Sequence, residues 1–346
     1  MHRPSRRRFL QHVGAASAAA TVAVPAYAEA IGTADRLSVG IIGCGGRGSG
    51  LLKTFRRIAD VAYVCDPDEA RRGKARESSG AKSAVSDLRR VLDDSSVDAV
   101  VVATPDHWHA PAAIMACEAG KHVYVEKPCS HNYNESRLLL DAARRNNVVV
   151  QHGTQSRSNE LVAGAVQMLR EGMIGDVLVA KVWNVQPRGN IGRKTPSDPP
   201  PGVDYDAWVG PAAFLPYQEN RFHYNWHWNW DYVNGDMGNQ GVHEMDIARW
   251  GLGVTLPTRV CTMGGHFMFD DDQNTPNTLM AMFEFTNEQG SGDKKKILQF
   301  ETRHWIGNRE DSMWLKPNPD SPTGYMISAA NTVGNLFYGS KGYMAK

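Results

Sequence analysis

The chain has 346 residues, 42% of them hydrophobic, which is long enough for two packed domains. Its formal net charge of +1 includes four arginines within the first eight residues, so the remainder is near −3 and lacks the basic excess typical of nucleic-acid binding. The five cysteines show no CxxC spacing and no long apolar stretch follows the N-terminus, which argues against a disulfide framework, a cysteine-rich zinc site and a membrane span.

The first residues have the order of an export signal. Residues 5–10 (SRRRFL) form a twin-arginine pattern, an alanine-rich apolar run covers residues 13–24, and Ala26-Tyr27-Ala28 suits a signal peptidase. We therefore predict a twin-arginine signal peptide over residues 1–28 and a periplasmic or otherwise exported mature protein. The alternative interpretation is a disordered basic tail.

Strands and helices alternate through the first half of the chain. Buried-type strands are expected at residues 37–42, 61–65, 98–103, 122–125 and 148–150. Helices are expected at residues 51–58, 111–119 and 138–142. This alternation predicts a parallel, doubly wound Rossmann sheet, and we assign residues 35–155 to an NAD-binding domain.

The second half has longer strands and fewer helices. After a short helix at 161–169, strand candidates lie at residues 176–185, 259–269, 278–285 and 296–302. This pattern predicts an α+β domain over residues 156–346, with a large and mainly antiparallel sheet, for substrate binding and oligomerisation. Residues 339–344 look like a hairpin cut short, which leaves open whether the domain is truncated at its C-terminus.

A glycine motif joins the first strand to the first helix. The residues expected to contact a cofactor there are Gly43, Gly45, Gly46, Arg47 and Gly48. In this context GxGxxG predicts a dinucleotide site, with the pyrophosphate at the helix N-terminus. Asp66 ends the second strand, where its carboxylate would accept hydrogen bonds from a ribose and repel a 2′-phosphate. We therefore expect NAD rather than NADP; the alternative is a glycine-rich turn with a solvent-facing aspartate.

Two further strand ends carry polar residues. Glu126-Lys127-Pro128 follows one strand, and Thr104-Pro105 with nearby His109 follows another. Because ligands collect at the carboxyl ends of strands in open α/β sheets, these residues are expected to contact the cofactor. His107 and His109 lack acidic or cysteine partners at ligand spacing, so no metal site is predicted.

With these motifs in view, the chain resembles the Gfo/Idh/MocA oxidoreductases over roughly residues 37–346. The resemblance depends on GCGGRG, on Ala103-Thr104-Pro105 with His109, on Glu126-Lys127-Pro128, and on the segment from Gly238 to Asp246 (GNQGVHEMD). It implies that Lys127 lies near the nicotinamide and the reacting hydroxyl, and that His243 faces the substrate. Asn239 stands where many members have an aspartate, which departs from the usual lysine–aspartate–histidine relay.

The residues themselves support these roles. Asn239, His243 and Asp246 are spaced i, i+4 and i+7, so they share one helix face. His243 could take a hydroxyl proton near neutral pH, and Lys127 could hydrogen-bond a developing alkoxide. The alternatives are a structural histidine at 243 and a salt bridge from Asp246 to Arg249.

Other residues are candidates for substrate contacts. Trp226, Trp228 and Trp230 alternate, which would turn three rings to one side of an extended segment, either toward a sugar or toward an interface. Arg157 follows the last strand of the first domain and could contact a charged substrate or a cofactor phosphate. The predicted substrate-binding set is Lys127, Arg157, Trp228, Asn239 and His243.

We predict an exported, homo-oligomeric NAD-dependent oxidoreductase, a dimer or tetramer, acting on a secondary hydroxyl of a sugar, glycoside or polyol. A second hypothesis is an NAD-assisted glycosidase or lyase that works by transient oxidation, elimination and water addition without net redox. A third is a binding protein that has kept the fold without catalysis.

Overall fold

The structure, a computed structural model, describes residues 36–286, 294–305 and 332–346. The predicted signal peptide lies outside these residues. No helix in the described ranges is long and apolar enough to cross a membrane. All five cysteines of the chain are described, and each is a free thiol.

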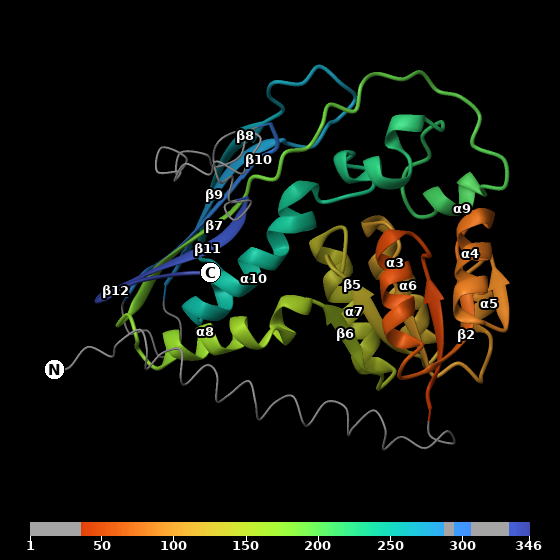
Figure 1. Cartoon of the computed structure of the whole chain (residues 1–346), viewed down its shortest axis with the longest axis horizontal. Helices are drawn as coiled ribbons and strands as arrows, with labels where there is room; N and C mark the ends of the chain where they lie inside the picture. Colours follow the sequence, from red (N-terminus) through yellow and green to blue (C-terminus); the bar gives the residue numbers. More distant parts are fainter. Residues whose placement is uncertain (1–35, 287–293, 306–331) are drawn as a thin grey trace, which may run out of the picture.

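The first domain is built on a parallel sheet, as predicted (Figure 1). The sheet has six strands where five were expected, because β3 was not among the predicted elements. Its strands are β1 (Ser38–Ile42), β2 (Asp60–Cys65), β3 (Ser83–Val85), β4 (Ala99–Val102), β5 (His122–Glu126) and β6 (Val150–Gly153). They lie in the order β3-β2-β1-β4-β5-β6, so the order reverses between β1 and β4. Ligands of doubly wound sheets bind at such a reversal, outside the carboxyl ends of the strands.

Five helices accompany this sheet. They are α3 (Gly46–Phe55), α4 (Glu69–Ser79), α5 (Arg89–Leu92), α6 (Asp106–Glu118) and α7 (Tyr133–Arg145). Helix α6 begins five residues before the expected start at Pro111, directly after the Thr104-Pro105 motif. Helix α4 has no counterpart among the predicted elements, because Ala75 is its one buried residue and an apolar periodicity is missing.

The second domain contains a six-stranded mixed sheet. Its strands are β7 (Val177–Asn184), β8 (Arg259–Gly265), β9 (Thr278–Phe285), β10 (Lys296–Arg303), β11 (Val333–Gly339) and β12 (Gly342–Ala345). The order is β12-β11-β7-β10-β9-β8, and β7 with β10 is the parallel pair among the described strands. The prediction of a mainly antiparallel sheet is confirmed.

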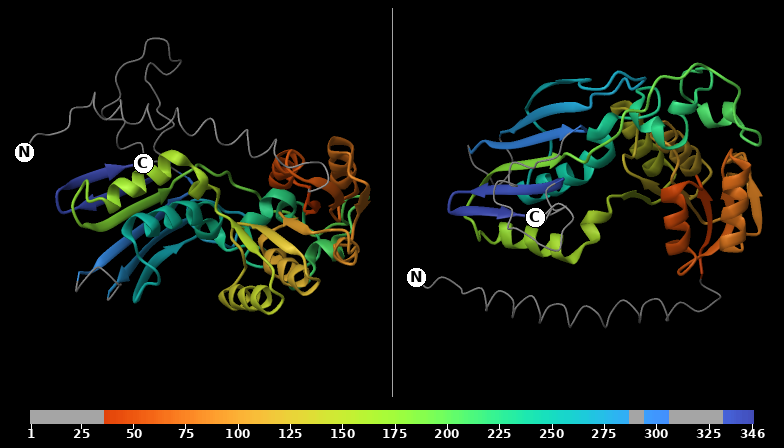
Figure 2. Two further views of the ribbon diagram at one scale, coloured as in Figure 1. Left: turned by 90° about the horizontal axis from the view of Figure 1, so that it is seen from below. Right: turned by 45° about the horizontal axis from the view of Figure 1, so that its top comes forward.

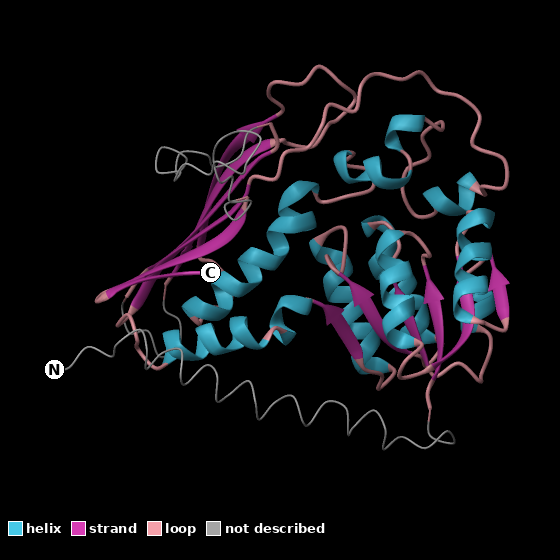
Figure 3. Ribbon diagram, in the orientation of Figure 1, coloured by secondary structure: helices cyan, strands magenta, loops and turns pink. Residues whose placement is uncertain are grey.

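Helices α8 (Glu160–Arg170) and α10 (Val242–Leu252) lie on the face of this sheet that is turned toward the first domain (Figures 2 and 3). Ile247 and Leu252 of α10 pack with Phe300 and Phe337 of the sheet in one buried cluster. A π-helical turn, η5 (Met237–Gly241), precedes α10 without a break. Because π-turns inside helices often occur at functional sites, the junction of η5 and α10 is a candidate functional site.

A long connecting segment, residues 185–204, carries the chain from β7 back over the first domain to α9 (Tyr205–Val209) (Figure 1). It has no helix or strand of its own and contacts the loop after β2. Glu69 N donates to Gly202 O at 3.0 Å, and Asp204 N donates to Pro67 O at 3.1 Å. The segment therefore attaches the second domain to the carboxyl edge of the Rossmann sheet.

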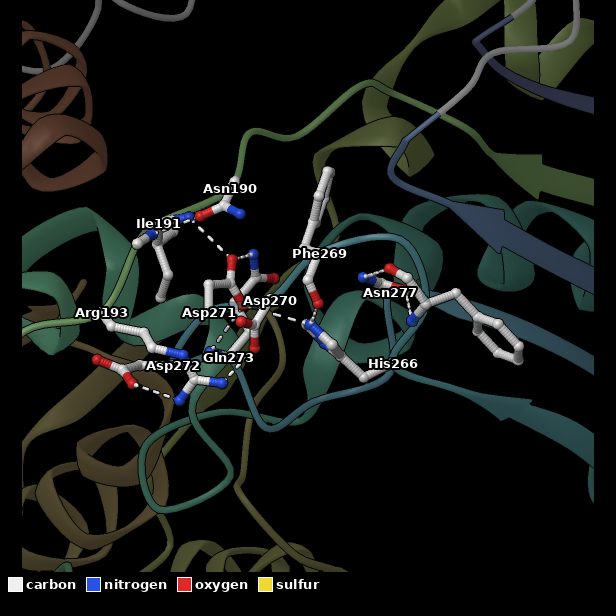
Figure 4. Close-up of polar contacts among 12 residues, drawn as sticks. Asn190, Ile191, Arg193, His266, Phe269, Asp270, Asp271, Asp272, Gln273 and Asn277 are labelled. Atoms are coloured by element: carbon white, nitrogen blue, oxygen red, sulfur yellow. Dashed lines mark hydrogen bonds and ion pairs between the residues drawn. The ribbon is translucent and has the colours of Figure 1, made fainter.

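The start of the connecting segment is held by an acidic loop after β8 (Figure 4). Asp271 accepts a hydrogen bond from Ile191 N at 2.9 Å, and Arg193 forms an ion pair with Asp270. Asp272 accepts from Lys194 N at 2.9 Å. The connecting segment makes no strand or helix hydrogen bonds of its own, so its backbone and side-chain donors need other acceptors. The three carboxylates supply them and so hold the segment in this conformation.

Candidate active site

A cavity of about 600 Å³ lies between the two domains. The first domain contributes the fingerprint loop, Asp66 and Lys127, all at the carboxyl edge of its sheet. The second domain contributes α9 and the short 3₁₀ helix η4 (His223–Trp228). Segments of the second domain, more than fifty residues beyond the end of the first domain in the sequence, thus form one wall of the cavity and limit the access of solvent from the side of α9 and η4.

The fingerprint loop has the shape that a pyrophosphate requires. Gly43 has a φ of +91°, and a Cβ there would lie 2.5 Å from the carbonyl oxygen of Ala103. A Cβ on Gly48 would overlap the carbonyl oxygen of Gly43, while Gly46 faces open space at the start of α3. The loop therefore tolerates no side chain where it turns and leaves the helix N-terminus accessible to an anion.

Asp66 is 6% exposed and lines the cavity at the end of β2. Its carboxylate accepts hydrogen bonds from Cys44 N at 2.7 Å and Asp68 N at 2.9 Å. Burial raises the pKa of Asp66, while the two backbone N–H groups oppose that rise. Each carboxylate oxygen keeps a second lone pair, which suits hydrogen bonds from the hydroxyls of a ribose.

Arg71 on α4 is a cofactor candidate that the sequence patterns did not indicate. It lines the cavity, and its Nη1 lies 3.0 Å from the position that a Cβ on Gly45 would occupy. A guanidinium beside the fingerprint loop can pair with a phosphate. The charged sequence of α4 gives no motif that would have singled out this arginine.

Lys127 extends from the end of β5 to the second domain. Its Nζ donates to the backbone oxygen of Asn239 at 2.7 Å and to Asn239 Oδ1 at 3.1 Å. Burial lowers the pKa of Lys127, and the carboxylates of Asp106, Glu126 and Asp236 counteract this effect. The structure therefore brings Lys127 and Asn239 together, as the resemblance implies.

Glu126 and Arg47 contact each other. Glu126 is 3% exposed, and its Oε1 accepts from Arg47 Nε at 2.6 Å and from the hydroxyl of Tyr124 at 3.3 Å. Both Glu126 and Arg47 line the cavity. The pair links the fingerprint helix to the strand that carries Lys127, so it aligns the two halves of the expected cofactor site.

His109 links two of the predicted motifs. Its Nδ1 lies 2.5 Å from the oxygen of Pro128, and its Nε2 lies 2.8 Å from the oxygen of Thr104. Burial lowers the pKa of His109 to about 4. Thr104, Pro105 and His109 all line the cavity, and the Thr104 hydroxyl is buried with no partner among the described residues. An unpaired buried hydroxyl beside the fingerprint loop fits a contact with a bound cofactor.

His243 is 6% exposed on α10, outside the residues that line the cavity. Burial, followed by the charge of Lys127, lowers the pKa of His243 to about 4, below the ordinary histidine value near 6.5. Its Nδ1 is buried without a partner in the described parts of the chain. The ring is therefore neutral at neutral pH, and the lowered pKa makes it a weaker base than an exposed histidine.

His227 is a further candidate that no sequence motif singled out. It lines the cavity, and its Nδ1 lies 2.5 Å from the oxygen of Tyr224. Since a carbonyl only accepts, Nδ1 carries the proton and Nε2 is left as an acceptor. Burial lowers the pKa of His227 to about 4, and the charge of Lys127 contributes.

Asp106 begins α6 and lines the same cavity. Burial raises the pKa of Asp106 to about 7, against the opposing effect of Lys127. Its Oδ2 is buried and has no partner among the described residues. Asp106 directly follows the Thr104-Pro105 motif, although Asp106 itself was not predicted as a site residue.

Arg157 and Asp246 bind each other away from the cavity lining. Arg157 Nε and Nη2 donate to the two carboxylate oxygens of Asp246 at 2.7 and 2.8 Å. The guanidinium also lies 4.7 Å from the ring centroid of Trp250. Asp246 thus pairs with Arg157 and not with Arg249, the partner considered in the sequence analysis. Catalytic and substrate-binding roles for the pair stay predictions.

The three alternating tryptophans do not share one side, because residues 223–228 form a 3₁₀ helix and not an extended segment. That prediction is wrong. Trp226 lines the cavity, Trp228 is 2% exposed and packs against His304, and Trp230 is 48% exposed.

Among the described residues, no three His, Cys, Asp or Glu side chains gather as a metal site would require.

Models of one oxidoreductase family match both domains. Residues 37–154 match its NAD-binding Rossmann fold, and residues 176–263 match its C-terminal α/β domain. An uncharacterised oxidoreductase of Streptococcus pneumoniae is 35% identical over 141 residues, which is 40% of this chain and 38% of that protein. A levoglucosan dehydrogenase of Pseudarthrobacter phenanthrenivorans is 36% identical over 121 residues, 35% of this chain and 30% of that protein.

A glycosyl hydrolase family 109 protein of Shewanella baltica is 31% identical over 209 residues, 51% of this chain and 45% of that protein. The chain thus spans less than half the length of these curated relatives.

Solved structures show the same fold. A levoglucosan dehydrogenase in complex with NADH has a TM-score of 0.63 at 20% identity, covering 90% of this chain and 73% of that one. GenD2 from gentamicin A biosynthesis, in complex with NAD, has a TM-score of 0.64 at 22% identity, with 90% and 72% covered. With both domains matched by the family's models and the fingerprint and Lys127 placed at one cavity, the chain belongs to the Gfo/Idh/MocA oxidoreductases.

Proposed function

We propose that the protein is an NAD-dependent oxidoreductase acting on a secondary hydroxyl of a sugar, glycoside or polyol. The observation that carries the proposal is the position of Lys127, whose amine is held by Asn239 in the cavity that the fingerprint loop also lines. NAD, when bound, supplies the acceptor for a hydride from the substrate carbon. The levoglucosan dehydrogenase among the relatives supports a carbohydrate substrate.

The chain's own residues handle the hydroxyl. Lys127 would donate a hydrogen bond to the substrate oxygen and so stabilise negative charge that develops there. As the C–H bond transfers its electron pair with the hydride, the O–H proton passes to a base and a carbonyl forms. Our candidate for that base is His243, because the family resemblance implies that it faces the substrate and its Nδ1 is buried without a partner among the described residues. Burial lowers its pKa to about 4, so the ring is neutral at neutral pH but is a weaker base than an exposed histidine.

The experiment that tests this proposal replaces Lys127 by Met. Turnover is expected to fall at least about 10³-fold while the affinity for NAD stays within about threefold, since the amine acts on the substrate oxygen. Lys53→Met, at an exposed lysine of α3, is the matched control and should leave both quantities unchanged. Near-normal turnover in Lys127→Met would contradict the proposal.

A second function has its own support. Glycosyl hydrolase family 109 proteins are among the relatives, and segments of the second domain cover the cavity, which suits a cofactor retained between turnovers. An NAD-assisted glycosidase or lyase would oxidise the sugar carbon, eliminate the glycosidic group, add water and return the hydride. Glycoside cleavage without lasting NADH distinguishes this reaction from net dehydrogenation.

We propose export by the twin-arginine route, on the strength of the SRRRFL pattern and the alanine-rich run after it. Replacing Arg6 and Arg7 by Lys should leave the protein in the cytoplasmic fraction with its signal uncleaved. Efficient export of that variant would count against the twin-arginine route.

We also propose a homo-oligomer that pairs the second sheets of two copies. On strands β8 and β9, Met263 is 79% exposed, its cross-strand neighbour Met280 is 50% exposed, and Met282 is 47% exposed. Such a row of exposed apolar side chains is typical of an interface. Light scattering should give a dimer or tetramer, and Met263→Glu should shift it toward the monomer. A monomeric wild type would contradict the proposal.

A further inference from the structure

Asn239 lies between a cation and a buried carboxylate. Its Oδ1 accepts from Lys127 Nζ at 3.1 Å, and its Nδ2 donates to Asp236 Oδ1 at 3.2 Å. An amide has one accepting and one donating end, whereas an ionised carboxylate only accepts and an ammonium only donates. Asp236 therefore fixes the orientation of the Asn239 amide, and that orientation presents an oxygen to Lys127.

Asp236 is itself held from the second sheet. It is 2% exposed, and its Oδ2 accepts from Asn184 of β7 and, at 3.1 Å, from Thr302 Oγ1 of β10. His304 Nε2 lies 3.2 Å from the same oxygen. Burial tends to raise the pKa of Asp236, but His304, Arg188 and Thr302 outweigh it, so the pKa lies below its usual value. Asp236 is thus an ionised group fixed to two strands.

We propose that Asp236 is the positioning residue for Lys127 and supplies, through the Asn239 amide, the carboxylate that many family members place at position 239. The inference rests on the proposed function, in which Lys127 acts on the substrate oxygen. Of the three N–H bonds of the ammonium, two are directed at Asn239, so one remains for the substrate. The connection from the sheet through Asp236 and Asn239 determines where that N–H points.

The link also affects the charge of Lys127, because Asp236 favours its ammonium form. Other charged or titratable groups act on the same amine or respond to it: Arg47, Asp106, Glu126, His109, His152, His227 and His243. A test must therefore move the carboxylate while leaving these groups in place.

The double variant Asp236→Asn with Asn239→Asp moves the carboxylate, and its two single variants remove one carboxylate or add one. Asp236→Asn should lower kcat about 10- to 100-fold with little change in the KM for NAD, because the Asn239 amide loses its fixed orientation. The double variant places the carboxylate beside Lys127 and should recover at least about tenfold of that loss. A merely structural Asp236 predicts the opposite, with the double variant as impaired as the single one or worse.

A second readout needs no substrate, so it separates failure of this inference from failure of the proposed function. Acetylation of the folded protein by acetic anhydride at a series of pH values, followed by digestion and mass spectrometry of the peptide that contains Lys127, reports the titration of the amine. Asp236→Asn should lower the midpoint by about one pH unit, because a nearby negative charge is removed, and the double variant should reverse the shift.

Asp270→Asn is the matched control, since it makes the same change of side chain at an exposed carboxylate that pairs with Arg193 and contacts neither Asn239 nor Lys127. It should leave the Lys127 midpoint unchanged. If Asp236→Asn does not fold, Asn239→Ala breaks the same link from the other side and should also lower the midpoint. An unchanged midpoint in the folded variant, or a double variant with no recovery, would overturn the inference.

Discussion

Lys127 and Asn239 are joined by two hydrogen bonds that cross the boundary between the domains, at 2.7 Å to the backbone oxygen and 3.1 Å to the side-chain oxygen. Lys127 belongs to the end of a Rossmann strand, whereas Asn239 belongs to the π-turn before α10. The amine that we assign to the substrate oxygen is therefore positioned by the second domain. The alignment of the expected cofactor site with the amine of Lys127 therefore depends on the contact between the two domains.

The cofactor preference depends on Asp66. Replacing Asp66 by Ala removes the carboxylate that we expect to bind the ribose and should weaken NAD binding about 10- to 100-fold. NADP should lose little affinity or gain some, because the repulsion of its 2′-phosphate disappears. Calorimetric titration with both nucleotides checks this, and an equal loss for NAD and NADP would contradict the assignment. Melting should also shift down, since Cys44 N and Asp68 N lose their acceptor.

Buried histidines should make the fold less stable at acid pH. Burial lowers the pKa of His107 to about 4, below the unfolded value near 6.5, so the unfolded chain binds the extra proton first. Its stabilising contribution is complete above pH 6.5 and is lost as the pH falls toward 4, at up to about 1.4 kcal/mol per pH unit.

His107→Gln tests this, because glutamine can still donate to the Trp208 oxygen but does not titrate. Urea unfolding at pH 7 and pH 5 should show a smaller drop in the free energy of unfolding for the variant than for the wild type. Equal drops in both proteins would mean that His107 is not among the groups responsible.

Arg157 and Asp246 should act as a structural pair. Arg157 is 43% exposed, so solvent screens the interaction and the coupling energy should be about 1 kcal/mol or less. A double-mutant cycle of Arg157→Ala and Asp246→Ala, followed by urea unfolding, measures it. Each single variant should keep kcat within about fivefold of the wild type. A loss of kcat above about 100-fold in Asp246→Ala, with the fold intact, would restore the catalytic role expected from the sequence.

Trp226 and Trp228 should differ in what they support. Trp226 lines the cavity, so Trp226→Ala should raise the KM for a sugar substrate about 10-fold at unchanged stability. Trp228 is buried against His304, so Trp228→Ala should instead cost about 3–5 kcal/mol of folding free energy. The same steady-state and urea measurements on both variants decide the assignment, which fails if Trp228→Ala alone changes the KM.

Patterns along the chain predicted the fold well where burial is periodic. Strands β1 and β4 are buried apolar runs and were predicted, whereas β3 (SAV) was not predicted and β6 (VQHG) begins at the last residue of the expected strand 148–150. The fingerprint with Asp66 indicated the expected cofactor edge from residue types and spacing alone. Helix α4 escaped prediction because nearly all its side chains are charged or small, and tertiary contacts rather than periodicity place it.

The site was predicted only in part. Lys127, Asn239 and the fingerprint follow from motifs, but the role of Asp236 depends on strands β7 and β10 meeting the π-turn. The tryptophan prediction failed because a 3₁₀ helix replaces the extended conformation that alternation assumes. His227 lies between two of the alternating tryptophans and Arg71 lies in the charged helix α4, and neither pattern indicates that these two side chains reach the cavity.

The central claim is that a hydride passes between NAD and a sugar carbon bound in this cavity. Rapid mixing of the NAD-loaded protein with a panel of sugars and glycosides tests this claim most directly. Absorbance at 340 nm should rise in the first turnover for at least one carbohydrate and remain flat in Lys127→Met. A rise that persists with oxidised product indicates a dehydrogenase, and a rise that decays as glycoside is cleaved indicates the redox-neutral alternative. A carbohydrate that binds and is converted with no change at 340 nm, transient or lasting, would contradict hydride transfer and the role of Lys127 that depends on it.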